Sequence, residues 1–62
     1  MPRFALTVDC DNAAFGEDRI DAGYEVATIL RRLASRLDGS PLEGGGALLD
    51  SNGNTVGSWT VR

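Results

Sequence analysis

Histidine, lysine and cysteine are almost or entirely missing from this sequence. Its 62 residues include one cysteine, no histidine and six basic residues, all of them arginines. Cys10 alone cannot form an internal disulfide, and the lack of histidine removes the ligand sets that usually bind zinc. No nucleophile with a neighbouring base can be assembled either, so we expect no enzymatic activity, no metal and no cofactor.

Long apolar runs are also missing. No stretch approaches the roughly 18 apolar residues that suggest a transmembrane helix, and Asp9 and Asp11 interrupt the apolar run near the start of the chain. We therefore expect no membrane span, no signal peptide and a cytoplasmic location.

The charge is low and acidic, with nine acidic residues against six arginines and a net charge of −3. Binding to the phosphate backbone of nucleic acid usually needs a basic patch, so nucleic acid is a disfavoured partner. The charges are segregated along the chain, however. Most acidic residues precede residue 22, whereas Arg31, Arg32 and Arg36 follow close together.

The clearest periodic segment is AGYEVATILRRLASRLD, residues 22–38, which we predict to be the helix. Its apolar residues recur at the three- and four-residue spacing of a helix with one buried face. Asp21 is placed to cap its N-terminus, Gly39 to end it in the left-handed conformation, and Pro41 to stop it from resuming. The predicted buried stripe consists of Ala22, Val26, Ile29, Leu30, Leu33 and Leu37.

Strict alternation of apolar and polar residues predicts a strand over residues 3–10. Phe4, Leu6 and Val8 share one face, which we expect to pack on the helix. Cys10 lies on the same face and is expected to point inward as a small apolar residue.

Two irregular connections flank the helix. The first, residues 11–21, contains Phe15 and Ile20, and we expect both to pack against the core. The second, residues 39–46, contains three consecutive glycines and is expected to be flexible or tightly bent.

Residues 47–62 are expected to form a hairpin around an Asn-Gly pair, for which two turns compete. A two-residue type I′ loop would pair Ser51 with Asn54. A type I turn with a G1 bulge would instead pair Asp50 with Asn54 and leave Gly53 left-handed. Aspartate at the first turn position favours the second turn.

The preferred turn assigns the two faces of the hairpin. Its core face would carry Leu49, Thr55, Gly57, Trp59 and Val61. Its other face would carry Leu48, Val56, Ser58 and Thr60. Because a different turn shifts the register, this assignment depends on the turn type.

The order strand, helix, strand, strand predicts an α+β fold. We expect a single β-α-β-β domain over residues 1–62, in which one amphipathic helix packs on a three-stranded sheet with a C-terminal hairpin. One helix covers only one face of such a sheet. The second face and the free edges therefore suggest a homodimer.

The outer face of the helix is the first candidate site. Tyrosine and arginine dominate the hot spots of protein interfaces, and both occur there. The alternative is an ordinary solvated helix face. The predicted partner-binding residues are Tyr24, Thr28, Arg31, Arg32 and Ser35.

An acidic patch before the helix is the second candidate. Its residues are Asp9, Asp11, Glu17 and Asp18. Their spacing does not fit a calcium-binding EF-hand loop, and acids near a helix N-terminus are favoured by the helix dipole. We therefore interpret them as solvated acids, with partial mimicry of nucleic-acid charge as the functional alternative.

Three segments together resemble a group of small proteins from bacteriophages, prophages and actinobacteria. They are DNAAF at residues 11–15, ILRRLASRL at 29–37 and DSNGNTVG at 50–57. The resemblance covers nearly the whole chain and implies a phage or mobile-element context, in which small proteins often bind a host protein. Inhibitors of bacterial defence, including anti-CRISPR proteins, are one such class.

The favoured hypothesis is therefore a non-enzymatic protein-binding module that inhibits a host defence complex such as CRISPR-Cas. Two alternatives remain open. One is a nucleic-acid-binding accessory protein that uses Arg31, Arg32 and Arg36. The other is a structural module whose role is self-association.

Overall fold

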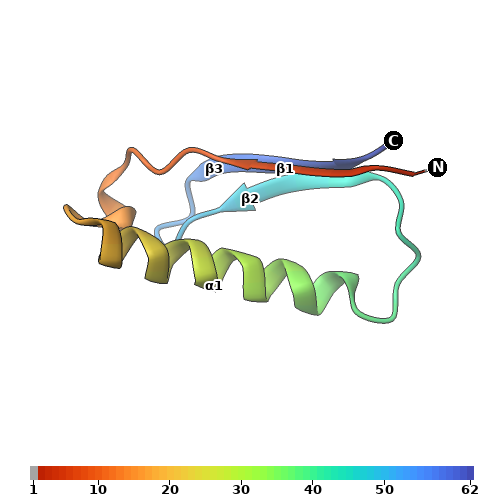
Figure 1. Cartoon of the computed structure of the whole chain (residues 1–62), viewed down its shortest axis with the longest axis horizontal. Coiled ribbons are helices and arrows are strands. Elements are labelled where there is room, and N and C mark those ends of the chain that lie inside the picture. Colours follow the sequence, from red (N-terminus) through yellow and green to blue (C-terminus); the bar gives the residue numbers. More distant parts are fainter. Residues whose placement is uncertain (1) are drawn as a thin grey trace.

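The computed structural model describes residues 2–62 and consists of one helix packed on one face of a three-stranded sheet (Figure 1). The strands are β1 (Phe4–Val8), β2 (Gly45–Leu49) and β3 (Thr55–Val61), and the helix is α1 (Arg19–Leu37). A short 3-10 helix, η1 (Ala13–Phe15), precedes α1. The predicted α+β fold is confirmed, although the ends of each predicted element are shifted.

The order of strands in the sheet is β1-β3-β2, and both pairings are antiparallel. β3 is therefore the central strand, while β1 and β2 form the two edges. The termini lie side by side because Arg3 and Arg62 exchange two backbone hydrogen bonds, with N···O distances of 2.5 and 2.9 Å (Figure 1).

The helix begins earlier than predicted because Asp18, and not Asp21, is its N-cap. Asp18 has the extended backbone of a capping residue, and its Oδ1 accepts a hydrogen bond from the backbone N–H of Asp21 at 2.8 Å. Asp21 thus lies in the first turn, where its charge complements the helix dipole. The predicted C-terminal end is confirmed, since Gly39 has a φ of +79°.

The hairpin turn has the predicted G1-type pairing. The N–H of Asp50 donates to the carbonyl oxygen of Asn54 at 2.9 Å, and the N–H of Gly53 donates to that of Asp50 at 3.1 Å. Gly53 has a φ of +83°, which glycine adopts without steric cost.

The predicted faces of the hairpin were partly wrong because β3 contains a bulge. Leu48 pairs with Gly57 and Leu49 pairs with Thr55, so Val56 has no partner on β2. A bulge reverses the alternation of faces beyond it. Leu48 and Val56 consequently turn toward the helix and are 5% and 8% exposed, whereas Leu49 is 44% exposed.

The core lies between the helix and the central part of the sheet. Phe15 is its most enclosed apolar side chain, at 1% exposed, so η1 closes one end of the space between the helix and the sheet. Leu6, Val8 and Trp59 pack around the core from the sheet, as predicted. The buried apolar residues are Phe15, Ile29, Leu33, Leu48 and Val56.

Four further residues predicted to be inside are exposed. Phe4, at the start of β1, is 40% exposed, and Leu30, at the border of the apolar stripe of α1, is 43% exposed. Ile20 is 71% exposed, because the earlier helix start places it in the first turn of α1, away from the sheet. Cys10 is also exposed, because β1 ends at Val8 and the chain leaves the alternating pattern before reaching it.

The face of the sheet opposite α1 is uncovered within residues 2–62 (Figure 1). Its side chains are small or hydroxylated apart from Leu49, and most are exposed. They belong to Ala5, Thr7, Ala47, Leu49, Thr55, Ser58 and Thr60. Over the same part of the chain, α1 does not carry a stretch that is both long and apolar enough to cross a bilayer.

Candidate functional site

The DNAAF and DxNGN motifs meet at one end of the molecule through the buried carboxylate of Asp50. Its Oδ1 accepts hydrogen bonds from the backbone N–H groups of Asn52 and Asn54, each at 2.9 Å. Its Oδ2 accepts from the side-chain amides of Asn12 at 2.7 Å and Asn54 at 3.4 Å. Asn12 in turn accepts from the N–H of Ala14 at 2.9 Å and so caps η1.

Asp50 is 2% exposed, and its environment acts on its ionisation in two opposite directions. Burial favours the neutral acid and acts to raise the pKa. The hydrogen bonds donated by Asn54, Asn12 and Asn52 favour the carboxylate and outweigh burial, so the pKa of Asp50 lies below its ordinary value of 3.8. The carboxylate therefore remains charged inside the fold and holds both motifs together.

A second polar contact joins the helix to the same turn. Glu25 is 7% exposed, and both of its carboxylate oxygens accept from the hydroxyl of Ser51, with a distance of 2.7 Å to Oε2. Together with Asp50, this contact satisfies the buried polar groups at this end of the molecule. The motif residues therefore serve mainly to fix the turn, η1 and the helix relative to one another.

The outer face of α1 carries four of the five predicted partner-binding residues. Tyr24 is 71% exposed, and Arg31 is also exposed. The hydroxyl of Thr28 donates to the carbonyl oxygen of Tyr24 at 3.0 Å, and that of Ser35 donates to the carbonyl oxygen of Arg31 at 3.2 Å. These two hydroxyls are bound to the backbone of their own helix, so Tyr24 and Arg31 are the side chains free to contact a partner.

Exposed Ile20 extends this face toward the start of α1. It lies one helical turn before Tyr24, and the two side chains lie on the same face because residues four apart are neighbours on a helix. Ile20, Tyr24 and Arg31 form what we call the outer helix face. Sequence reasoning missed Ile20 because it placed the helix start after this residue.

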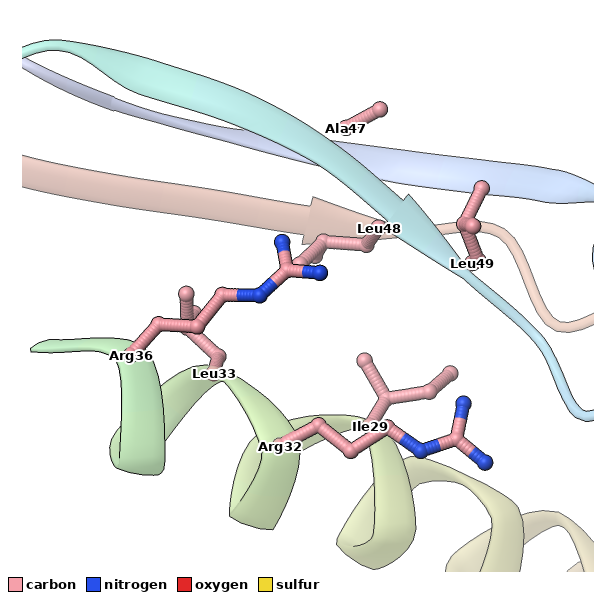
Figure 2. Close-up of a pocket in the computed structure, with 7 residues that line it drawn as sticks. All are labelled: Ile29, Arg32, Leu33, Arg36, Ala47, Leu48 and Leu49. Atoms are coloured by element: carbon pink, nitrogen blue, oxygen red, sulfur yellow. The ribbon is translucent and has the colours of Figure 1, made fainter.

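Arg32, the fifth predicted residue, lies elsewhere. Successive helical residues turn by about 100°, so Arg32 points away from the face that carries Arg31 and toward β2. Figure 2 shows Arg32 and Arg36 extending from α1 on the side of β2, beside Ile29, Leu33 and Leu48. These residues, with Ala47 and Leu49, line a cavity of about 330 Å³, which we call the α1–β2 groove.

The predicted acidic patch is divided in the structure. Asp9 and Asp11 are adjacent, since the N–H of Asp11 donates to Oδ1 of Asp9 at 3.1 Å. A side-chain hydrogen bond with Asp9, followed by repulsion from its charge, raises the pKa of Asp11 above 3.8. Asp18 is used as the helix cap. Residues 2–62 contain no group of three or more acidic, cysteine or histidine side chains arranged to hold a metal ion.

The α1–β2 groove was not predicted. Arg36 was considered only together with Arg31 and Arg32 as a nucleic-acid contact, and Leu49 was assigned to the core. The sequence offered one indication of the groove: Arg32 and Arg36 lie four residues apart at the border of the apolar stripe, so they are neighbours on one side of the helix. The bulge that turns Leu48 inward and Leu49 outward gave no comparable signal.

Comparison with known proteins yields no family model, no curated protein and no solved structure that matches this chain. The resemblance to phage and actinobacterial proteins therefore stays a prediction.

Proposed function

We propose that this protein is a non-enzymatic protein-binding module that contacts its partner through the outer helix face. The observation that carries the proposal is the pair Ile20 and Tyr24, each 71% exposed and one helical turn apart. Arg31 continues the same face toward the middle of α1.

The composition of this face supports binding. When a partner covers exposed isoleucine and tyrosine, the free energy of binding becomes more favourable by roughly 25 cal/mol for each Å² of apolar surface removed from water. Tyrosine and arginine are also enriched among residues that dominate interface energetics. The polar network behind the face holds Glu25 and the start of α1 in place, which lowers the entropic cost of binding.

The biological setting follows from the resemblance described above. It supports a phage or mobile-element protein that acts in the host cytoplasm and binds a host protein. An inhibitor of a host defence complex such as CRISPR-Cas is the most specific form of this proposal. The accompanying expectation of a homodimer is checked by light scattering over a range of concentrations, and a monomer at every concentration would contradict it.

Affinity capture with variants tests the outer helix face. The tagged protein is incubated with lysate of a bacterial host, and bound proteins are compared between wild type and two variants, Ile20→Ser/Tyr24→Ser and Arg31→Glu. Leu42→Ser is the matched control, because Leu42 is 51% exposed but lies in the α1–β2 connection.

The expected result is a partner that wild type and Leu42→Ser retain and that both outer-face variants lose. Substitution at these exposed positions leaves the core intact, so thermal unfolding should change little. A partner retained equally by all four proteins would show that the outer helix face is not the contact surface. Failure to capture any specific partner would contradict a host-protein target.

The alternative function is nucleic-acid binding, and the exposure of Arg31, Arg32 and Arg36 favours it. Arg31 and Arg32 point in different directions, however, and the net charge of −3 opposes approach to a polyanion. A gel shift at about 50 mM salt separates the two functions, since phosphate contacts are strongest at low salt. Absence of a shift there excludes this alternative.

A further inference from the structure

We propose that the α1–β2 groove binds an extended peptide segment with two acidic side chains, which adds to the edge of β2 as a fourth strand. This goes beyond the proposed function, because the groove and the outer helix face lie on different sides of α1. Three features carry the inference: the backbone of β2, the floor of the groove and the two arginines above it.

The edge of β2 offers unpaired backbone groups at alternate residues. Val61 donates its N–H to the carbonyl oxygen of Gly44 at 2.9 Å, which fixes this pair as hydrogen-bonded. Hydrogen-bonded pairs alternate along an antiparallel ladder, so the next such residues on β2 are Gly46 and Leu48. Gly45, Ala47 and Leu49 therefore direct their N–H and C=O groups away from β3. That row is a template for another strand.

The floor of the groove is apolar and lies beside this edge. Ile29 and Leu33 of α1 meet Leu48 of β2 there, and all three are nearly buried. The cavity of about 330 Å³ remains open beside them (Figure 2). A strand placed along β2 would direct every second side chain over this floor, because side chains alternate across a sheet.

Arg32 and Arg36 supply the charge that selects the occupant. Both are exposed, and neither forms an ion pair with a carboxylate within residues 2–62. Side chains four apart on a helix have Cβ atoms about 5–6 Å apart, and alternate residues of a strand are about 6.6 Å apart. Two acidic residues separated by one residue in the added strand would thus each meet one arginine.

Other occupants fit less well. A second copy paired through its own β2 would bring its two arginines to the same edge, which opposes like charges. The edge of β1 is the opposite edge of the sheet, away from Arg32 and Arg36, and the chain continues from it into Asp9 and Asp11. Nucleic acid could meet Arg32 and Arg36 through its phosphates, but phosphates only accept hydrogen bonds and would leave the C=O groups of Ala47 and Leu49 unpaired. An acidic extended peptide uses all three features.

The test uses two synthetic peptides of about nine residues, enough to span the five residues of β2. Both alternate valine and threonine. One carries glutamate at two alternate central positions on the same face, and the other carries glutamine there. Affinity is measured by fluorescence anisotropy of the labelled peptides, and exchange of the Ala47 and Leu49 amides is followed by NMR.

The glutamate peptide should bind about tenfold more tightly than the glutamine peptide, because two exposed ion pairs each contribute modestly. Arg32→Gln/Arg36→Gln should remove this preference. Arg31→Gln should retain it, and is the matched control on the outer helix face. The Ala47 and Leu49 amides of wild type should exchange more slowly when the peptide is bound.

A backbone variant tests strand addition separately. Ala47→Pro removes one outward N–H and leaves the bonds to β3 in place, as proline on an edge strand can. It should weaken both peptides. If this variant does not fold, the amide exchange of wild type decides the same point.

Three results would overturn the inference: equal affinity for both peptides, no binding of the glutamate peptide, or unchanged exchange at Ala47 and Leu49. A DNA duplex that binds through Arg32 and Arg36 while the glutamate peptide does not would also overturn it. None of these results depends on the outer helix face, so the proposed function is tested independently.

Discussion

Gly57 is the position at which the smallest change should most damage the fold. A Cβ atom added there would lie 2.0 Å from the carbonyl oxygen of Thr7 and 3.0 Å from the Cα of Val8. Both atoms belong to the backbone of β1, so no side-chain rotation relieves the contact. Gly57→Ala should therefore push β1 away from the central strand.

The cost of Gly57→Ala follows from the distance that must be gained. An ordinary contact begins at 3.4 Å, so the strands must separate locally by about 1.4 Å. Overpacking of this kind costs about 1–3 kcal/mol. The neighbouring bond from the N–H of Asp9 to the carbonyl oxygen of Val56, now 2.7 Å, would also weaken, at about 1 kcal/mol. A total near 3 kcal/mol is large for a chain of 62 residues, whose whole stability is about 3–9 kcal/mol.

Gly23→Ala is the matched control, because a Cβ at Gly23 meets nothing within 4 Å. Gly23 lies inside α1, where alanine is favoured over glycine by about 0.8–1.0 kcal/mol. Thermal unfolding followed by circular dichroism should show Tm raised by about 4–8 °C in Gly23→Ala and lowered by at least about 10 °C in Gly57→Ala. A Gly57→Ala protein that melts within a few degrees of wild type would refute the close approach of β1 to the bulge.

Two further predictions concern the hairpin. Leu48→Ala should cost about 2–5 kcal/mol and Leu49→Ala less than about 1 kcal/mol, because only Leu48 is buried; urea unfolding checks the pair, and the reverse order would contradict the bulge. Asp50→Asn should reduce the acid sensitivity of stability. Since folding lowers the pKa of Asp50, its carboxylate stabilises the fold above pH 3.8, and this contribution is lost as pH falls through the lower pKa of the folded state. Urea midpoints from pH 6 to pH 2 should therefore fall less in Asp50→Asn than in wild type, and parallel curves would contradict this role.

The sequence predicted those features that depend on local patterns. The stripe of Ile29 and Leu33 needs only the helical period, and the turn at Asp50 needs only the chemistry of four residues. The strand β1 needs only alternation. Each of these features is decided within a short window, which explains why the fold class could be predicted.

The errors concern features that local patterns leave open, either because distant segments decide them or because two local choices are equivalent. The bulge at Val56 follows from how β3 pairs with both of its neighbours, and it reverses the predicted positions of Leu48 and Leu49. The helix start depended on a choice between two aspartates with equal capping chemistry, and the wrong choice hid Ile20. The α1–β2 groove depends on both the helix rotation and the bulge, so it could not be predicted from either pattern alone.

The structure also changes what the DNAAF and DSNGNTVG segments can indicate. Asn12 and Asn54 both donate hydrogen bonds to the carboxylate of Asp50, and Gly57 has no room for a side chain. A second protein with DNAAF and DxNGNxVG would therefore need them to build the same end of the fold, whatever it binds. Partner choice would instead depend on exposed positions outside those motifs, such as Tyr24 and Arg32. The same two segments in another protein would accordingly indicate a common fold, while differences on α1 would allow different partners.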